Sequence, residues 1–474
     1  MIPKLLIYIV IISMPSAHGQ LLQLLLPQAL NSFKGSIGNL TNPVETLNNI
    51  IDGEIFTKML RFLTSVILTV AWTVDADRNV QNLLTDNIVA SKRVRFVRDY
   101  NLGLRNEDWQ LSSIQLVEKY GFPVETHETV TEDGYVLGLF RIRGGGPVVF
   151  LMHGLSGSAD DFVISGPDSG IAYLLAKDGY DVWMGNARGT KHSLRHVQLK
   201  PSWAKFWDFS WHEIGYFDLP AMIDYTLNAT NQDTLKYIGH SQGTTCFWVM
   251  CSERPDYNDK VSLMVALAPV AFMYNAQSPI LRGLVSVPGL VDSFSSREGR
   301  EMYMRQSCGD AGGPLYKLFC VNFLLFTSGF NLNTMNASVL PVLLGHASAG
   351  SSVKQSIHYA QQIVSGKFRR FDYGVTENIR RYGFREPPNY ELTNIRTPVA
   401  LIYSDTDWLS DVRDVEKLLY YLPNVFDTYK IQHQQFTHLD YVLGKNLKDT
   451  IYKRMKIMLS SVLVFLNSTE HAQY

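Results

Sequence analysis

Short apolar runs alternate with longer stretches of mixed polarity over most of this 474-residue chain. A short apolar run between turn-forming residues is typical of a buried strand, and the longer stretches suit helices. The runs predict strands near Val148, Val182, Tyr237, Met264, Leu401 and Thr428. Strands that alternate with helices in this way predict a mostly parallel sheet with helices on both faces.

The stretch from Glu125 to Arg143 follows a different pattern. Apolar and polar residues alternate there on both sides of Glu132-Asp133-Gly134. A period of two around such a turn sequence is typical of a β-hairpin. We expect this hairpin to add antiparallel strands at the edge of the sheet.

One connection between predicted strands is unusually long. The strand that ends near Pro269 and the strand that starts near Pro398 are separated by far more chain than a plain connection needs. Its apolar runs are irregular and broken by Gly and Pro. We therefore expect an inserted helical cap over residues 275–390, between core segments 101–274 and 391–474.

A serine stands between a predicted strand and a predicted helix in Gly239-His240-Ser241-Gln242-Gly243. This G-x-S-x-G pattern is that of a nucleophile elbow, a sharp turn that exposes the serine Oγ. A Cβ atom at either glycine position would clash in so sharp a turn. The β-prone run 234–238 precedes the motif and the apolar run 244–251 follows it. The context predicts Ser241 as a nucleophile.

A serine nucleophile needs a base, and the base needs a group that orients it. In this type of fold the acid and then the histidine follow the serine along the chain. Asp407 lies in the loop after the next-to-last predicted strand, and His438 follows the last one. These places predict Asp407 as the orienting acid and His438 as the base. Asp405 and Asp411 are alternative acids, and His433 is an alternative histidine.

The negative oxygen that forms during such a reaction is bound by backbone N–H groups. One comes from the residue after the nucleophile, and another from the loop after an earlier strand. The first position is Gln242 here. The predicted strand Pro147–Met152 runs into His153-Gly154-Leu155, which makes the Leu155 N–H the expected second donor.

These residues are part of a larger set of motifs that resembles the acid lipase family, which comprises gastric and lysosomal lipases and their insect relatives. The resemblance runs from about Asn106 to about Phe465. The matching motifs are Lys119-Tyr120-Gly121-Phe122-Pro123, Thr131-Glu132-Asp133-Gly134-Tyr135, Gly185-Asn186-Ala187-Arg188-Gly189-Thr190, Phe206-Trp207-Asp208-Phe209-Ser210-Trp211-His212-Glu213, Ile357-His358-Tyr359-Ala360-Gln361, Phe371-Asp372-Tyr373-Gly374 and His438-Leu439-Asp440-Tyr441.

The resemblance implies an α/β-hydrolase fold and a serine hydrolase of lipid esters that works through an acyl-enzyme. Ser241, Asp407 and His438 match the triad positions of the family, and Leu155 and Gln242 match its oxyanion hole. Triacylglycerol is the default substrate, while steryl, wax and retinyl esters stay open. The cap would cover the active site, line an acyl pocket and act in part as a lid at a lipid surface.

Two other functions compete with hydrolysis. A lipid-binding or storage protein could use the same scaffold, but every triad position is occupied, which argues against it. An acyltransferase would use the same triad and replace water by an alcohol.

Basic and acidic side chains, 43 and 44 in number, nearly balance without basic runs, so we expect no nucleic-acid partner. Cysteine and histidine lack zinc-like spacing, and we expect no metal and no cofactor. The oligomeric state stays open.

The N-terminus has the features of a secretory signal peptide over residues 1–19. Lys4 precedes the apolar run Leu5–Ile12, and small residues follow in Ala17-His18-Gly19. This run is too short to span a bilayer, and we expect no transmembrane segment. Residues 20–100 form an extension of unclear role that contains a second short apolar run.

Cysteines and glycosylation sequons fit a chain that passes through an oxidising compartment. Cys308 and Cys320 flank a glycine-rich loop suited to closure, and we predict a disulfide between them. Cys246 and Cys251 lie on the helix after the nucleophile and are expected to stay as buried thiols. The sequons begin at Asn39, Asn228, Asn336 and Asn467. With the signal peptide they predict a secreted or lysosomal protein.

Overall fold

The computed structural model describes residues 107–286, 289–293, 304, 306–307, 327–329, 334, 339–346, 349–432 and 435–470. All of them belong to the second of two compact units of the chain, which spans Asn106–Tyr474. The predicted signal peptide and N-terminal extension lie outside the described residues. So do Asn39, Asn336, His433 and the predicted disulfide of Cys308 with Cys320.

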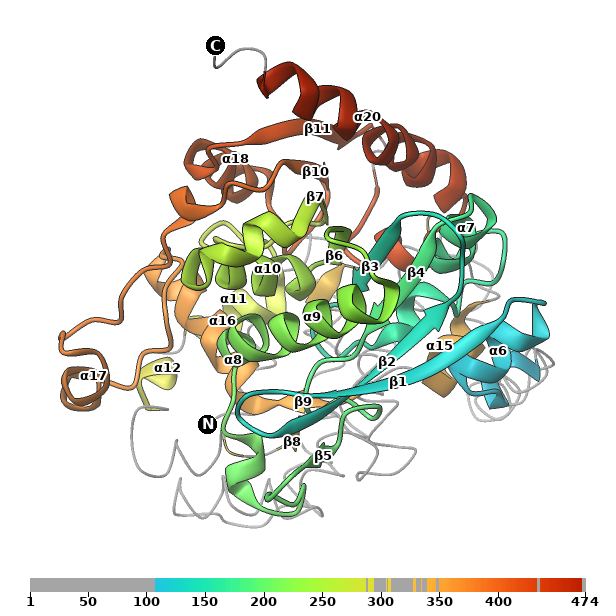
Figure 1. The fold of residues 1–474 in the computed structure, drawn as a ribbon. Coiled ribbons are helices and arrows are strands. Elements are labelled where there is room, and N and C mark those ends of the chain that lie inside the picture. Colours follow the sequence, from blue (N-terminus) through green and yellow to red (C-terminus); the bar gives the residue numbers. More distant parts are fainter. Residues whose placement is uncertain are drawn as a thin grey trace, which may run out of the picture. The chain divides into compact units, whose positions relative to one another are not determined.

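A mixed sheet of nine strands is the centre of the described region (Figure 1). Along the sheet the order is β1-β2-β4-β3-β6-β7-β10-β11, and the short β5 pairs with β2. The strands are β1 (Val124–Val130), β2 (Tyr135–Ile142), β3 (Val148–Met152), β4 (Asp181–Gly185), β5 (Arg195–His196), β6 (Leu235–His240), β7 (Val261–Leu267), β10 (Val399–Ser404) and β11 (Val425–Ile431).

The pairing directions confirm the predicted fold class. Neighbours are parallel from β4 through β3, β6, β7 and β10 to β11. The hairpin β1–β2 is antiparallel and joins β4 in antiparallel fashion, so it occupies the edge of the sheet as predicted. Each predicted parallel strand is present at its expected place. The short apolar runs of β3, β4 and β6 are strands buried on both faces.

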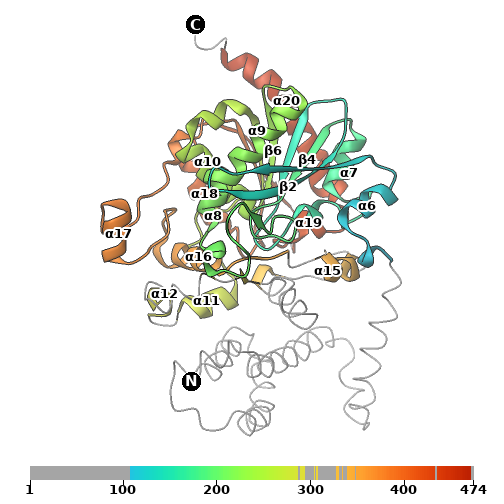
Figure 2. The same ribbon diagram turned by 60° about the horizontal axis from the view of Figure 1, so that its bottom comes forward.

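Helices cover both faces of the sheet, and each face has its own apolar core. Successive residues of a strand point to opposite faces. In β3, accordingly, Phe150 packs in one core and Leu151 in the other. The helices α9, α10 and α18 contribute to the first core, and α6, α7 and α20 to the second. In Figure 2, α10 and α7 lie on opposite sides of the strands.

The helices outside the predicted cap vary in length and type. The α-helices are α6 (Ser113–Lys119), α7 (Ile171–Lys177), α8 (Trp211–Glu213), α9 (Leu219–Thr230), α10 (Gln242–Glu253), α18 (Val412–Tyr421), α19 (Asp440–Leu443) and α20 (Lys453–Glu470). Short 3-10 turns are η3 (Glu107–Gln110), η4 (Ala159–Phe162), η5 (Ala204–Trp207), η7 (Pro255–Lys260) and η10 (Leu392–Asn394), and π-type turns are η6 (Ile214–Asp218) and η11 (Lys448–Tyr452). The sequon residue Asn228 is exposed on α9, and Asn467 falls within α20.

The described elements between β7 and β10 are helices and one small strand pair. Its elements are α11 (Pro279–Val285), α12 (Leu290–Ser293), α15 (Leu340–His346), α16 (Val353–Ser365), α17 (Val375–Tyr382) and the small pair β8 (Gln306–Ser307) and β9 (Ser351–Ser352). None of the described residues in this stretch joins the main sheet. The limits assigned to the cap and to the two core segments stay predictions.

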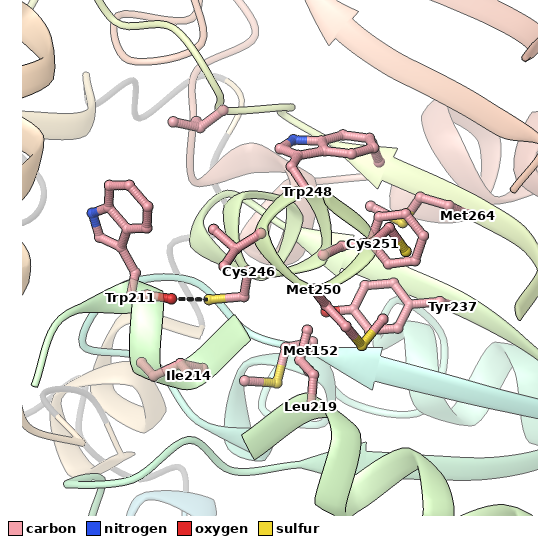
Figure 3. Packing of buried hydrophobic residues seen from close by; sticks show 14 of the residues in the cluster. Met152, Trp211, Ile214, Leu219, Tyr237, Cys246, Trp248, Met250, Cys251 and Met264 are labelled. Atoms are coloured by element: carbon pink, nitrogen blue, oxygen red, sulfur yellow. Dashed lines mark hydrogen bonds between the residues drawn. The ribbon is translucent and has the colours of Figure 1, made fainter. Parts of the chain in front are cut away.

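The helix α10 packs among buried apolar side chains (Figure 3). Every residue from Gln242 to Ser252 is buried, as expected for a helix without a polar face. Cys246 and Cys251 are both free and buried, as predicted. Cys246 Sγ donates a hydrogen bond to the carbonyl oxygen of Trp211 at 3.6 Å. Burial raises the pKa of both thiols, so they stay protonated and serve as core residues.

Candidate active site

Ser241 occupies a sharp turn between β6 and α10. Its φ of 51° and ψ of −114° are unusual for a residue other than glycine, and such conformations cost about 1–3 kcal/mol. A Cβ atom at Gly239 would lie 2.8 Å from the carbonyl carbon of Gly243. A Cβ atom at Gly243 would lie 2.3 Å from the carbonyl oxygen of Met152. Both glycines are therefore required by close backbone approach, and strand, turn and helix follow in the predicted order.

Ser241, His438 and Asp407 form a continuous chain of hydrogen bonds. The Oγ of Ser241 lies 2.6 Å from Nε2 of His438, and Nδ1 of His438 lies 2.9 Å from each carboxylate oxygen of Asp407. When Nδ1 carries the proton toward Asp407, Nε2 is free to accept the hydroxyl proton of Ser241. Ser241 follows β6, Asp407 follows β10 and His438 follows β11. The carboxyl ends of parallel strands meet at one edge of a sheet, so these three residues come together there.

Asp407 is held by more than the histidine. Its Oδ1 accepts the backbone N–H groups of Leu409 and Ser410, each at 2.9 Å. The side chains of Asp407 and His438 are almost fully buried, at 0% and 2% exposure. Low dielectric strengthens the hydrogen bond between the carboxylate and the imidazole, so this arrangement keeps the ring of His438 oriented toward Ser241.

The alternative acids have other partners. Asp405 forms an ion pair with Lys430 at 2.6 Å, and more than half of its side chain is exposed. Asp411 accepts the backbone N–H of Arg413 as the N-cap of α18 and also pairs with the guanidinium of that residue. Of the three candidate aspartates, Asp407 is the one that the fold brings to His438.

The loop after β3 lies against the nucleophile turn. A Cβ atom at Gly154 would be 3.3 Å from Cβ of Ser241 and 3.3 Å from Nδ1 of His240. Gln242 is the first residue of α10, where backbone N–H groups have no intrahelical acceptor. Within the described part of the chain, the N–H groups of Leu155 and Gln242 meet no acceptor. Two donors next to Ser241 are thus available to an oxygen atom of a substrate.

Two buried histidines that the sequence analysis left without a role support this site. Burial lowers the pKa of His153 to about 4 and that of His240 to about 3, so both are neutral near neutral pH. His153 Nδ1–H donates to the carbonyl oxygen of Gly154 at 2.8 Å. His240 Nε2–H donates to the carbonyl oxygen of His438 at 3.0 Å. Their positions beside Gly154 and Ser241 in the motifs are the signal that could have marked them.

Comparison with known proteins places this site in a family. A model for the α/β-hydrolase fold matches residues 147–306, and a model for a partial α/β-hydrolase lipase region matches residues 113–166. Lipase 1 of Drosophila melanogaster is 41% identical over 358 residues, which cover 75% of this chain and 81% of that protein. The chain belongs to the α/β-hydrolase lipase family. It is a carboxylic ester hydrolase of that family.

Other relatives of this lipase-family chain extend the same match. Lipase 3 of Drosophila melanogaster is 40% identical over 363 residues, with 73% of this chain and 92% of that protein covered. Gastric triacylglycerol lipase of Rattus norvegicus is 35% identical over 376 residues, with 76% and 94% covered. The resemblance to gastric and insect lipases drawn from the motifs is thereby confirmed.

Motifs of this hydrolase outside the triad are largely structural. Arg188 is 1% exposed, and its guanidinium donates to Asp218 at 2.7 Å and to Asp133 at 2.6 and 2.8 Å. Removing one partner of such a buried pair typically costs about 3–5 kcal/mol, because a charge is left uncompensated. The Thr131–Tyr135 and Gly185–Thr190 motifs are therefore linked by one ion network.

Three further motifs of the hydrolase meet where α16 packs on the core. The ring of His358 stacks on Trp211 with centroids 3.7 Å apart and planes 8° apart. Lys354 is buried, and its Nζ donates to Asp208 at 2.9 Å and to the Tyr373 hydroxyl at 2.8 Å. The contacts of His358 with Trp211 and of Lys354 with Asp208 join segments that are more than a hundred residues apart, so they fix α16 against the core.

The described residues hold neither a metal-binding cluster nor a membrane-spanning helix. Among the described residues, no group of three or more His, Cys, Asp or Glu side chains could hold a metal ion. No helix within the described ranges is both long enough and apolar enough to cross a bilayer.

Proposed function

We propose that this chain hydrolyses lipid esters through Ser241, His438 and Asp407. The observation that carries the proposal is the hydrogen-bond chain at the nucleophile turn, with 2.6 Å between Ser241 Oγ and His438 Nε2. Ser241 Oγ attacks the ester carbonyl carbon while His438 Nε2 takes the hydroxyl proton. Asp407 keeps Nδ1 protonated and stabilises the imidazolium that forms.

The backbone N–H groups of Leu155 and Gln242 bind the oxyanion in this proposal. The tetrahedral intermediate collapses as His438 gives its proton to the leaving alcohol, and an acyl-enzyme remains on Ser241. Water then attacks the acyl carbon and gives its proton to His438. The second intermediate releases the fatty acid, and the proton returns to Ser241 Oγ. Removal of one oxyanion donor typically lowers kcat by about 10²–10³.

Triacylglycerol is the substrate that we propose first, because one of the relatives is a gastric triacylglycerol lipase. Steryl, wax and retinyl esters share the reacting carbonyl and are the alternatives. We propose that the cap predicted over residues 275–390 lies above the site and opens in part at a lipid surface. The predicted signal peptide and sequons support a secreted or lysosomal location.

The deciding experiment assays the purified full chain on emulsified triolein, cholesteryl oleate and soluble short-chain esters from acid to neutral pH. Ser241→Ala is assayed beside the parent. The proposal expects release of free fatty acid from a long-chain ester by the parent and none by the variant. Equal hydrolysis by both proteins would refute the mechanism. Addition of an alcohol separates acyl transfer from hydrolysis, because only hydrolysis yields free acid.

A further inference from the structure

One short segment contacts both sides of the proposed oxyanion hole. Residues 349–355 connect α15 to the first turn of α16, within the predicted cap. The Ala349 N–H donates to the carbonyl oxygen of Ser156 at 2.9 Å. The hydroxyls of Ser156 and Ser351 lie 2.9 Å apart and share a hydrogen bond. Ser156 directly follows Leu155, so this end of the segment holds the loop that carries the Leu155 N–H.

The loop needs such support because its backbone is in an unfavourable conformation. Ser156 has a φ of 59°, in the left-handed region that favours glycine. A residue in that region costs about 1–3 kcal/mol and persists only when surrounding contacts hold it. For Ser156 these contacts include Ala349 and Ser351. Ser351 is 3% exposed, so water does not compete for its hydroxyl.

The other end of the segment contacts the side chain of Gln242, the residue that carries the second proposed donor. Gln355 Oε1 accepts a hydrogen bond from the side-chain amide of Gln242 at 2.7 Å. The two side chains are 1% and 3% exposed. The Oε1 atom of Gln242 is buried and meets no donor in the described part of the chain. The bond to Gln355 is therefore the one described hydrogen bond that fixes the Gln242 side chain.

The segment is itself rigidly attached to the core between these two contacts. Ser352 Oγ donates to the carbonyl oxygen of Phe209, and the neighbouring Lys354 is held by Asp208 and Tyr373. Ser352 and Lys354 are both buried. A segment anchored in this way can hold a loop and a helix start at a constant separation.

We propose that residues 349–355 set the position of the two oxyanion donors, with Ser351 and Gln355 as positioning residues. The inference rests on the proposed function, because it assigns the Leu155 and Gln242 N–H groups to the oxyanion. Donors stabilise an oxyanion only at about 2.7–3.1 Å, and a misplacement of about 1 Å can lower the rate by about 10²-fold. Loss of the Gln355 acceptor leaves a buried amide unpaired, and Gln242 shifts to satisfy it.

The test measures kcat and KM of the full chain on a soluble ester for Gln355→Ala, Ser351→Ala and Gln361→Ala. Gln361 is the matched control, since it lies on the same helix and its amide bonds to the backbone of Asp372 instead. We expect kcat to fall about tenfold in Gln355→Ala and about threefold in Ser351→Ala, with KM within about twofold of the parent. The control keeps the parent kcat.

A variant that adds a charge, Gln355→Glu, gives a pH dependence of kcat that would be absent if Gln355 only stabilised the fold. Gln355→Glu keeps an acceptor for the Gln242 amide but places a negative charge beside the developing oxyanion. Its kcat relative to the parent should therefore rise as the pH falls and the new carboxyl is protonated. A ratio that does not depend on pH contradicts the proposal. If Gln355→Ala does not fold, this variant and Ser351→Ala decide.

Two results separate this inference from the proposed function. Parent-like kcat in Gln355→Ala, together with loss of activity in Ser241→Ala, overturns the positioning role alone. Parent-like activity in Ser241→Ala overturns the proposed function itself. Equal losses of kcat in Gln355→Ala and Gln361→Ala, with equal losses of melting temperature, also overturn the positioning role, because α16 would then act only through stability.

Discussion

Two serines at the site both have a positive φ, and for different reasons. Ser241 has a φ of 51° and Ser156 a φ of 59°. The turn at Ser241 is possible because Gly239 and Gly243, its close neighbours in sequence, leave room for the backbone. The turn at Ser156 is held by Ser351, which is 195 positions away.

The difference shows which parts of an active site a motif can encode. A strained turn that depends on its own neighbours needs particular residues at constant spacing, and G-x-S-x-G is that spacing. A strained turn that depends on a distant segment needs only that the segment arrive at the right place. The proposed nucleophile could therefore be found from the sequence, whereas the support of the proposed oxyanion loop could not.

The largest effect is expected at the turn that the motif encodes. Ser241→Ala should lower kcat/KM by about 10⁴–10⁶, because the nucleophile is lost. The fold should stay intact, since the change removes one oxygen atom. Ester hydrolysis and thermal unfolding measured on the same samples check this. Activity within tenfold of the parent would show that Ser241 is not the nucleophile.

The next effect tests the acid that the fold selects. Asp407→Asn should lower kcat by about 10³–10⁴, because an amide favours the wrong tautomer of His438. Asp405→Asn is the matched control, two residues away and paired with Lys430 at the surface. It should change kcat by less than about twofold. An inactive Asp405→Asn together with an active Asp407→Asn would show that Asp407 is not the acid.

Substitution of a glycine in the nucleophile turn tests whether that turn depends on its close neighbours in sequence. Gly243→Ala should destabilise the fold by about 3 kcal/mol or more, because the new Cβ would lie 2.3 Å from the Met152 carbonyl oxygen. Gly145→Ala is the control, since its Cβ would meet nothing within 4 Å. Urea unfolding compares the two. Equal stability of both variants would mean that the elbow tolerates a side chain.

The buried histidine of the oxyanion loop predicts a pH effect on stability. The pKa of His153 is about 4 in the folded chain, below an unfolded value of about 6.5. The contribution of neutral His153 to the free energy of unfolding is therefore full above about pH 6.5 and is lost as the pH falls toward 4. His153→Gln should remove up to about 3 kcal/mol of the difference in unfolding free energy between pH 7 and pH 4.

The measurement must compare His153→Gln with the parent, because burial raises the pKa of Asp161 to about 7. Titration of Asp161 changes stability with pH in the opposite direction to that of His153. Asp161 gives most stability at low pH and loses it as the pH rises through 7. The difference between parent and His153→Gln isolates the histidine. The same pH slope in both proteins would show that His153 does not titrate as stated.

The smallest effect is expected at the turn held from a distance. Ser156→Ala should lower kcat about threefold, since it removes the hydroxyl contact with Ser351 but keeps the backbone bond from Ala349. Steady-state kinetics on a soluble ester check this value. A loss of kcat as large as that of Ser241→Ala would show that Ser156 is needed for the reaction as much as Ser241 is.

Much of the fold and of the candidate site was predictable from local pattern. The strands β3, β4, β6, β7, β10 and β11 are apolar runs at the predicted places, and the hairpin β1–β2 follows its period of two. The elbow at Ser241 follows from glycine spacing. The order of the proposed nucleophile, acid and base follows from the order of the strands that precede them.

The choice among three aspartates marks the limit of that prediction. Asp405, Asp407 and Asp411 lie within one loop, and the sequence favours Asp407 without excluding the other two. Asp407 contacts His438 because the loop turns inward there and buries that side chain against the backbone N–H groups of Leu409 and Ser410. This direction depends on tertiary packing.

The sequence by itself determined the class of this protein, its parallel sheet and the residue types of its site. These depend on hydrophobic period, turn sterics and motif spacing, which act between near neighbours. Only the tertiary structure decided between Asp407 and its two alternatives, made His153 and His240 neutral supports, and brought Gln355 to Gln242. These depend on contacts between distant segments, and such contacts leave no period or spacing in the chain.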